Sequence, residues 1–414
     1  MLCLVGYSTM KKHLVYLFIV ASFYVAPAFC IAQPMPVNEN DLSGKYPFIS
    51  TVFNRISNNS GLDSFYQKLH RLKSDGSGTV SIVHIGDSHI QADFMTAVVR
   101  NGLQHFFGNA GRGLVFPYQL AQSNSPDDIY SSSSIRWQFN RIAHPEISIG
   151  YGISGYSIKT SAENASLQIS LRGLARPFTR VRLFADSLGI WTIKPVDNDS
   201  SFEMKKDPDC NCTTIELNRE NTGFTLTSQT PEVNKIIYGA SLENNNPGVI
   251  YHTIGVNGAR LDQYNLADLF WQQLPALKAD LFIISLGTNE AQWDAFPETA
   301  YKKSLQLFIE KLKAASPGAC LLFTTAPDSY KRRRYNGVLK DLNSALINYC
   351  NTNYIPVWDL YRITNGYGSA YSWARRGLMT SDRIHFTPEG YRLQGSLLLS
   401  ALAKGYNGFA DLLP

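Results

Sequence analysis

The 414-residue sequence predicts an α/β fold, a flavodoxin-like three-layer sandwich with a parallel five-stranded sheet, interrupted by an inserted all-β sandwich. Two patterns predict this class. Short, β-branched apolar runs alternate with amphipathic helical patterns, which is typical of a parallel sheet covered by helices on both faces. From residue 126 to 247, short segments of strict period-2 alternation are separated by Ser, Asn, Gly and Asp, which indicates antiparallel sheets.

The five apolar runs expected to form the parallel sheet are residues 79–85, 249–254, 281–286, 320–325 and 354–358. Helical patterns lie between and after the last four. In residues 299–313, for example, Leu305, Phe308, Ile309 and Leu312 follow the i, i+3, i+4, i+7 spacing of one apolar helix face. The α/β domain is therefore expected in two parts, residues 33–125 and 248–414.

The segment 126–247 is expected to form the inserted β domain. Residues 167–171 and 181–185 alternate apolar and polar side chains, as half-buried strands do. Two interpretations stay open. The segment is either a long decorated loop without function, or a sandwich that helps to hold a polymeric substrate.

The first 32 residues have the pattern of a secretory signal peptide. Met10 and two lysines precede an apolar run, Leu14–Val25, and small residues lead to a cleavage site after Ala32. The run is shorter than the roughly 20 residues of a membrane span. We therefore expect Met10 to be the natural start, and the mature protein to be periplasmic or extracellular without stable membrane insertion. A retained anchor and a lipoprotein at Cys30 are the alternatives.

The composition excludes two broad classes of protein. Hydrophobic residues make up 44%, charged residues 17% and aromatic residues 12%, far from the polar, aromatic-poor composition of disordered chains. The 38 Lys and Arg against 33 Asp and Glu give a net charge of +5. This excess is too small and scattered to indicate a nucleic-acid partner.

Ser88 is the first candidate for chemistry. The run 79–85 ends in Gly86-Asp87-Ser88-His89, and a helical pattern begins at Ala92. Open α/β sheets bind ligands at the carboxyl ends of their strands, and a helix N-terminus there favours negative charge. A serine in this position, taken alone, is more often a simple helix N-cap.

A second cluster, Asp382 and His385, strengthens the interpretation. Thr387 and Pro388 follow as a helix N-cap and first helical residue, so the pair lies in a loop held by a helix start. The three-residue spacing lets the carboxylate orient the imidazole, which can then take the proton of a serine hydroxyl. No third ligand of suitable spacing follows, which disfavours a metal site.

Donors for a developing oxyanion are expected from two further positions. Gly258 follows the second expected strand and Asn289 the third. Glycine lets a backbone N–H approach closely, and the Asn289 amide can donate beside it and the Ser88 N–H. Because all these residues lie at the carboxyl ends of strands of one sheet or at its last helix, they are expected to converge.

In this order the blocks resemble those of the SGNH, or GDSL-like, serine hydrolase family. The matching residues are Gly86-Asp87-Ser88, Gly258, Gly287-Thr288-Asn289 and Asp382-x-x-His385. The resemblance implies Ser88 as nucleophile, His385 as general base and then acid, and Asp382 as the orienting carboxylate. It implies Ser88, Gly258 and Asn289 as oxyanion donors. His89 replaces the leucine of Gly-Asp-Ser-Leu, and Glu290 stands where Asp often follows the asparagine.

Within that family, the inserted β-sandwich and the Gly-Asp-Ser-His block resemble bacterial envelope peptidoglycan O-acetylesterases. The resemblance implies a carbohydrate-binding-module-like insert in a secreted serine esterase that removes O-acyl groups, above all acetyl, from a polysaccharide such as peptidoglycan, without a cofactor. The alternatives are an acetylesterase for xylan or other dietary or host glycans, an O-acyltransferase, and a catalytically silent glycan-binding envelope protein.

Several residues near these blocks are candidates for substrate contacts, namely His89, Gln91, Glu290 and Trp293. Trp373 either stacks on a sugar or packs in the core. The segment Lys331–Arg334 either meets an anionic glycan or is a solvated loop. Gly108–Gly113 lacks the features of a phosphate loop and is expected to be a turn.

Four cysteines remain after the expected cleavage, Cys210, Cys212, Cys320 and Cys350. Disulfides are permitted in an exported protein, and four cysteines allow three pairings. Buried free thiols are equally ordinary for Cys320 and Cys350, so their state stays open.

Overall fold

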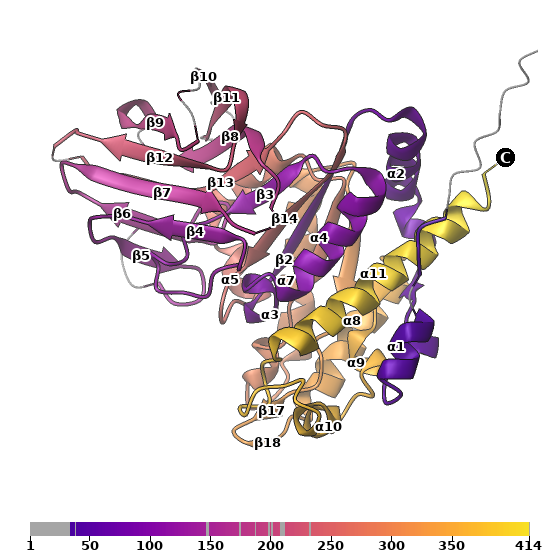
Figure 1. The fold of residues 1–414 in the computed structure, drawn as a ribbon. Coiled ribbons are helices and arrows are strands. Elements are labelled where there is room, and N and C mark those ends of the chain that lie inside the picture. The colour runs from indigo at the N-terminus through magenta and orange to yellow at the C-terminus, as the bar shows by residue number, and fades with distance from the viewer. Residues whose placement is uncertain are drawn as a thin grey trace, which may run out of the picture. The chain divides into compact units, whose positions relative to one another are not determined.

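A computed structural model describes residues 34–413 except 38, 146–148, 174, 187, 198, 200, 201, 208–211 and 232 (Figure 1). The chain divides into two units, Met1–Ile31 and Ala32–Pro414, and everything below concerns the second. The expected signal peptide, Met10 and Cys30 lie outside the described residues. In the described part of the chain, no helix has both the length and the apolar character needed to cross a membrane.

The central sheet contains the five predicted parallel strands. They are β2 (Thr79–Gly86), β14 (Gly248–Gly255), β15 (Leu281–Ser285), β16 (Cys320–Thr324) and β19 (Val357–Trp358). Their order is β19-β16-β15-β2-β14, and the predicted fold class is confirmed. A sixth strand, β1 (Ile56–Ser57), pairs antiparallel with β19. A strand of two residues leaves no periodic signal in the sequence.

The last strand is shorter than predicted. Strand β19 begins at Val357 rather than at Tyr354. Tyr354 has a φ of 54°, in the left-handed region, and Pro356 has no N–H to donate to a neighbouring strand. The apolar run therefore begins before the point at which the backbone can pair.

Helices cover both faces of this sheet. One face is covered by α2 (Asp63–Asp75), α4 (Phe94–Phe107) and α11 (Pro388–Ala410), and the other by α5 (Leu261–Asn265), α6 (Asp268–Gln273), α7 (Glu298–Ala315) and α8 (Val338–Thr352). The described residues also form α1 (Glu39–Lys45), α3 (Ser88–Gln91), α9 (Leu360–Ile363) and α10 (Ser369–Arg375). Helix α7 contains the predicted helix 299–313, and its four apolar residues are buried.

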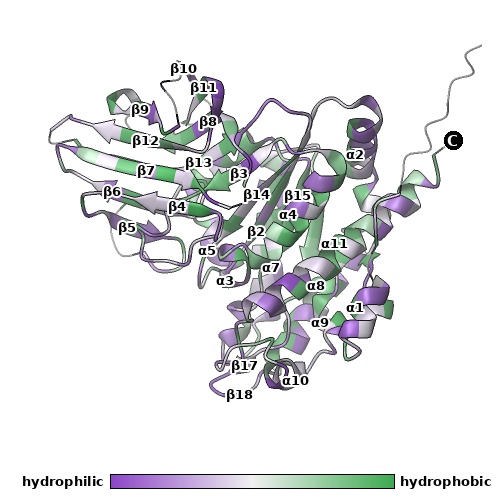
Figure 2. Ribbon diagram, viewed as in Figure 1, coloured by the Kyte–Doolittle hydropathy of each residue, from purple (hydrophilic) through white to green (hydrophobic). Residues whose placement is uncertain are grey.

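Alternate strand residues face the two helix layers. Ile82 packs in the core of α4 and α11, whereas Val83 packs in the core on the other side. On the first side α4 and α11 lie against each other (Figure 1), because Gly102 and Gly395 leave no side chain between them. Figure 2 shows hydrophobic residues over much of α4, as expected for a helix packed between the sheet and α11.

The inserted segment forms two antiparallel sheets. One contains β10 (Phe202–Asp207), β11 (Cys212–Asn221), β8 (Phe178–Ala185), β13 (Lys235–Glu243), β6 (Tyr156–Thr160) and β5 (Gln138–Arg141), with β3 (Gly111–Val115) paired to β13. The other contains β4 (Ile129–Ser132), β7 (Ala165–Leu171), β12 (Gly223–Ser228) and β9 (Thr192–Pro195). Both alternating segments identified in the sequence are strands, β7 and β8.

The prediction for the glycine-rich segment before the insert is partly wrong. We expected a turn at Gly108–Gly113, but Gly111 begins β3, which pairs with β13 of the insert. Glycine is required here because a Cβ on Gly113 would lie 2.4 Å from the carbonyl oxygen of Tyr251. The β structure thus begins before residue 126, and the domain limits 126 and 247 remain predictions.

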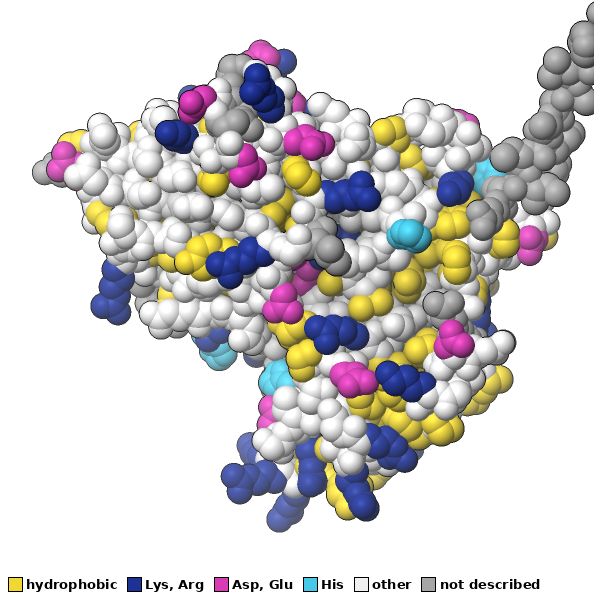
Figure 3. All heavy atoms as spheres, viewed as in Figure 1, with side chains coloured by type: hydrophobic (Ala, Val, Ile, Leu, Met, Phe, Trp, Pro, Cys, Tyr) yellow, Lys and Arg dark blue, Asp and Glu magenta, His cyan; other side chains and the backbone are white. Residues whose placement is uncertain are grey.

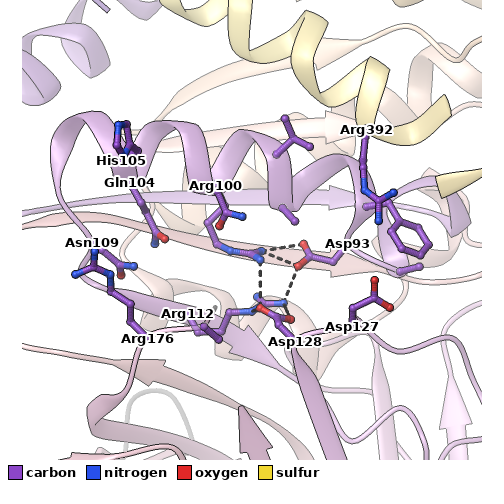
Figure 4. A pocket seen from close by; sticks show the side chains of 16 residues that line it. Asp93, Arg100, Gln104, His105, Asn109, Arg112, Asp127, Asp128, Arg176 and Arg392 are labelled. Atoms are coloured by element: carbon purple, nitrogen blue, oxygen red, sulfur yellow. Dashed lines mark hydrogen bonds and ion pairs between the residues drawn. The ribbon is translucent and has the colours of Figure 1, made fainter. Parts of the chain in front are cut away.

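Buried charges tie the insert to helix α4 (Figure 4). Arg112 of β3 bonds Asp93 at 2.7 Å and Asp128, next to β4, at 2.5 Å. Arg100 of α4 bonds Asp93 at 2.8 Å. Both arginines are at most 6% exposed, and the four charges compensate one another beside a cavity of about 440 Å³. This network holds three chain segments together below the carboxyl edge of the sheet.

The cysteines differ in state. Cys320 and Cys350 are buried free thiols, and Cys212 is disulfide-bonded. Cys210 lies outside the described residues. Trp373 is 1% exposed and packs edge-on against Phe386, so it belongs to the core and is not available for stacking on a sugar.

Candidate active site

Ser88, His385 and Asp382 form a hydrogen-bonded chain. Ser88 Oγ lies 3.0 Å from His385 Nε2, and His385 Nδ1 lies 2.8 Å from Asp382 Oδ2. Ser88 begins α3 directly after β2, and Asp87 caps this short helix by accepting a hydrogen bond from the His89 N–H at 2.9 Å. Two segments 297 residues apart thus meet in the geometry of a nucleophile, a base and an orienting carboxylate.

Gly86 allows the nucleophile to sit at this point. A Cβ on Gly86 would lie 2.6 Å from the carbonyl oxygen of Ser285 on the neighbouring strand β15. The Gly86 carbonyl in turn accepts a hydrogen bond from the Tyr264 hydroxyl at 2.9 Å. The backbone just before Ser88 is therefore held from both sides.

The loop that carries Asp382 is built to keep its carboxylate ionised. Asp382 Oδ1 accepts hydrogen bonds from Thr380 Oγ1 at 2.6 Å, the Ile384 N–H at 2.8 Å and the His385 N–H at 3.0 Å. Burial raises the pKa of Asp382, but the hydrogen bonds from His385, Thr380 and the backbone outweigh it and hold the pKa well below its usual range. Thr387 caps α11 as predicted, accepting from the Gly390 N–H at 3.3 Å.

The two predicted oxyanion donors lie in the loops after β14 and β15. Gly258 has a φ of 85°, which favours glycine, and a Cβ there would lie 3.2 Å from His144 Nε2. Asn289 Nδ2 donates to the Ala259 carbonyl at 3.0 Å and to Asp87 Oδ2 at 3.3 Å. The loops after β2, β14 and β15 are thereby joined at one edge of the sheet, as the sequence predicts.

Two buried carboxyl groups flank Asn289. Asp87 and Glu290 are each 1% exposed, and Glu290 Oε1 accepts a hydrogen bond from the Leu261 N–H at 2.8 Å. Burial raises the pKa of Asp87 to about 7 and that of Glu290 to about 7, although backbone hydrogen bonds oppose this. Both carboxyl groups therefore change charge close to neutral pH.

The raised pKa of Glu290 predicts a measurable effect on stability. The folded protein keeps this proton up to about pH 7, whereas the unfolded chain releases it near 4.5, so stability falls as the pH rises through this window. Glu290→Gln removes one titrating group and keeps the acceptor for Leu261. The loss of unfolding free energy between about pH 5 and about pH 8 should be smaller by about 2 kcal/mol in Glu290→Gln. Urea unfolding at both pH values measures it, and equal losses in both proteins would contradict the assignment.

The four candidates for substrate contacts lie in different surroundings. Gln91 is 1% exposed, and its amide bonds Tyr156, Ser123, Asn124 and the Asn257 N–H. All its hydrogen-bonding capacity is used, which favours a role in joining the insert to the site. Glu290 is buried, as described above. Trp293 is partly exposed, with the Arg260 guanidinium 5.5 Å from its ring centroid, and remains a candidate.

His89 lies beside His385. Its ring centroid is 5.7 Å from that of His385, and its Nδ1 is 3.2 Å from the Tyr391 hydroxyl. Burial lowers the pKa of His89 to about 3, so this ring stays neutral. The geometry favours support of the His385 ring over contact with a substrate.

Three residues at the site were not identified from the sequence. Thr380 bonds Asp382, Asp87 bonds Asn289, and His144 of the insert approaches Gly258. Asp87 lies inside the recognised block, so its position was a usable signal. His144 is an exposed residue in a loop of the insert, and nothing in its sequence context relates it to Gly258. Among the described residues, no cluster of three or more His, Cys, Asp or Glu side chains could hold a metal ion.

The family assignment rests on residues 225–393, which match the GDSL-like Lipase/Acylhydrolase family. This part of the chain is similar to GDSL-like acylhydrolases. The matched range includes Gly258, Asn289, Asp382 and His385, and Ser88 lies before it. The prediction of a GDSL-type hydrolase is confirmed.

One solved structure has the same fold over most of its length. A structure of a peptidoglycan O-acetylesterase is similar with a TM-score of 0.67 and 22% identity, over 83% of this chain and 96% of the other. An acetyl xylan esterase, AlAXEase, is similar over 37% of this chain and 81% of its own, at 18% identity and a TM-score of 0.31. A GDSL-like lipase from Bacteroides thetaiotaomicron is similar over 37% of this chain and 76% of its own, at 22% identity and a TM-score of 0.31. No curated protein matched the chain.

Proposed function

We propose that this acylhydrolase is a secreted serine esterase that removes O-acetyl groups from a polysaccharide, with peptidoglycan as its substrate. The observation that carries the proposal is the chain Ser88–His385–Asp382, with separations of 3.0 and 2.8 Å at the carboxyl edge of the sheet. The N-terminal signal pattern supports secretion.

In the proposed mechanism, His385 Nε2 takes the Ser88 hydroxyl proton while Oγ attacks the ester carbonyl carbon. Asp382 stabilises the resulting imidazolium through Nδ1. The negative charge that develops on the carbonyl oxygen is received by the Ser88 and Gly258 N–H groups and by Asn289 Nδ2. Asn289 gives up its longer bond, 3.3 Å to Asp87, to make this contact.

The intermediate then collapses to an acyl enzyme. The bond between the acyl carbon and the sugar oxygen breaks, and His385 returns its proton to that oxygen. Water, deprotonated by the same histidine, attacks the acyl carbon. Its proton passes to Ser88 as acetate leaves, so the enzyme ends in its starting form.

Two observations favour a polymeric substrate. The side chains of His385 and Asp382 are 41% and 45% exposed, so a long chain can reach the triad without entering a deep tunnel. The similarity to the peptidoglycan O-acetylesterase covers 83% of this chain, which is more than the segments outside the insert supply, so it extends into the inserted β domain. The insert, through His144, lies beside Gly258 and can contact sugars next to the ester.

The proposed function predicts acetate release from O-acetylated peptidoglycan at a rate well above that from acetyl xylan, about tenfold or more, because only the former matches the proposed substrate. The purified protein is incubated with each polymer, acetate is quantified, and the glycan products are identified by mass spectrometry. Faster release from xylan would replace the proposed substrate by a plant glycan. Transfer of acetyl to an added glycan without free acetate would replace hydrolysis by acyl transfer.

A further inference from the structure

A basic face with exposed tyrosines adjoins the catalytic loop. It consists of Arg333, Arg334, Tyr335, Tyr367, Tyr371 and Arg375, from β17 (Tyr330–Lys331), β18 (Arg334–Tyr335), the turn between them and helix α10 with the loop before it. We call it the basic tyrosine face. Figure 3 shows a group of Lys and Arg side chains at this end of the molecule, over β17, β18 and α10.

The face is attached directly to the loop of the triad. The Tyr330 N–H donates to the Arg383 carbonyl at 2.8 Å, and Arg383 follows Asp382 in the chain. The Arg383 guanidinium lies 4.7 Å from the ring centroid of Tyr330 and 5.3 Å from that of Tyr371. A polymer bound at the triad can therefore extend onto this face.

The tyrosine rings are unusually open to solvent. Tyr335, Tyr367 and Tyr371 are 46%, 58% and 40% exposed. The rings of Tyr335 and Tyr367 lie 5.5 Å apart at 44°, which gives a continuous aromatic surface. Exposed aromatic clusters mark interaction sites, and aromatic rings with polar tips suit sugars, which have apolar faces and hydroxyl edges.

The arginines of the face lack acidic partners. Within the described residues, Arg333, Arg334 and Arg375 form no ion pair, whereas Lys331 and Arg332 share Asp294 at 3.4 and 3.1 Å. Guanidinium groups bind carboxylates and phosphates in a bidentate manner. The free positive charge is thus concentrated on the same surface as the exposed rings.

A groove borders the basic tyrosine face. It has a volume of about 920 Å³ and runs between the β17–β18 hairpin, residues 294–296 and the start of α8. Residues 294–296 follow Asn289 and the partly exposed Trp293 by a few positions. The groove therefore extends the surface beside Tyr335.

We propose that the basic tyrosine face binds a carboxylate-bearing stretch of the glycan substrate while its acetyl ester lies at Ser88. The inference deepens the proposed function and rests on it. The tyrosines stack on sugar rings, and the free arginines bind the carboxylates of peptide stems attached to the glycan. The face would therefore select anionic O-acetylated glycans over neutral ones.

The test compares Arg333→Ala/Arg334→Ala with the matched control Lys205→Ala/Lys206→Ala, which removes two positive charges from exposed positions on β10. On soluble O-acetylated peptidoglycan, the arginine variant should show a KM raised about tenfold with kcat unchanged. Hydrolysis of p-nitrophenyl acetate should not change. The difference should vanish at about 0.5 M salt and on peptidoglycan whose carboxylates have been amidated. Equal KM values for the variant and the wild type would overturn the inference.

A binding measurement separates this inference from the proposed function. Ser88→Ala is sedimented with intact and with amidated peptidoglycan, with and without the arginine substitutions. Loss of binding on amidation, and in the arginine variant but not in the lysine control, supports the face even if no ester is hydrolysed. Unchanged glycan binding combined with arginine-dependent binding to phosphatidylglycerol vesicles would overturn it and assign the face to a membrane surface.

Discussion

Ser88→Ala is expected to lower kcat for ester hydrolysis by about 10⁴-fold or more. Alanine removes the atom that forms the acyl enzyme, and no other hydroxyl bonds His385 Nε2 in the described residues. Initial rates with p-nitrophenyl acetate and with O-acetylated peptidoglycan measure the effect. The control is Ser396→Ala, a partly exposed serine on α11 whose hydroxyl donates to the Arg392 carbonyl of its own helix, and this variant should keep full activity.

The double variant Ser88→Ala/His385→Ala makes this prediction sharper. Residues that act as one unit have strongly non-additive effects, so the double variant should be no slower than Ser88→Ala by more than about threefold. Wild-type activity in Ser88→Ala would contradict the proposed mechanism. A further large loss in the double variant would mean that His385 acts on another nucleophile.

Arg112→Met is expected to lower the unfolding free energy by about 3–5 kcal/mol. The guanidinium bonds both Asp93 and Asp128, and its removal leaves the buried Asp93 and the partly buried Asp128 short of positive charge. Arg100 keeps its contact with Asp93 at 2.8 Å but reaches Asp128 only at 3.4 Å. Arg112 joins β3 to α4 and to the start of β4. The substitution should therefore weaken mainly the contact between the insert and the α/β domain.

Urea unfolding of the variant and the wild type measures this loss. The control is Lys302→Ala, which breaks an exposed i,i+4 pair with Glu298 and should cost about 0.3–0.5 kcal/mol. A change below about 1 kcal/mol in Arg112→Met would show that the network contributes little to stability.

The strands of the central sheet were predictable because each is buried on both faces. Residues of β2 pack in two opposite helix layers, and such strands appear as continuous apolar runs. The apolar pattern did not predict a row of hydrogen-bonded polar side chains that crosses this sheet. His84 bonds Tyr251 at 2.8 Å and Ser285 at 2.7 Å, and Thr324 bonds Ser285 at 2.8 Å. Three of these residues look like breaks in apolar runs, and only the pairing of strands shows that they satisfy one another.

The convergence of the candidate site residues was predictable for a different reason. Ser88, Gly258 and Asn289 each follow a parallel strand, and carboxyl ends of parallel strands meet at one edge. The positions of these residues directly after the predicted strands were therefore enough to predict that they lie close together. The same reasoning places Gln91 and His89 near the site but says nothing about exposure, and both turn out to be buried.

The features predicted from the sequence are local, whereas those that only the tertiary structure shows are contacts between distant segments. Hydrophobic periodicity and the residues within each of the Gly-Asp-Ser, Gly, Gly-Thr-Asn and Asp-x-x-His blocks are local features of the sequence. They are enough to indicate the α/β class, the β insert and the candidate catalytic residues. Which neighbouring groups use up the hydrogen bonds of Gln91, how His144 reaches Gly258, and how the tyrosines gather beside Arg383 depend on contacts between segments far apart in sequence. Local patterns carry no record of such contacts, because burial and charge compensation are properties of the packed molecule.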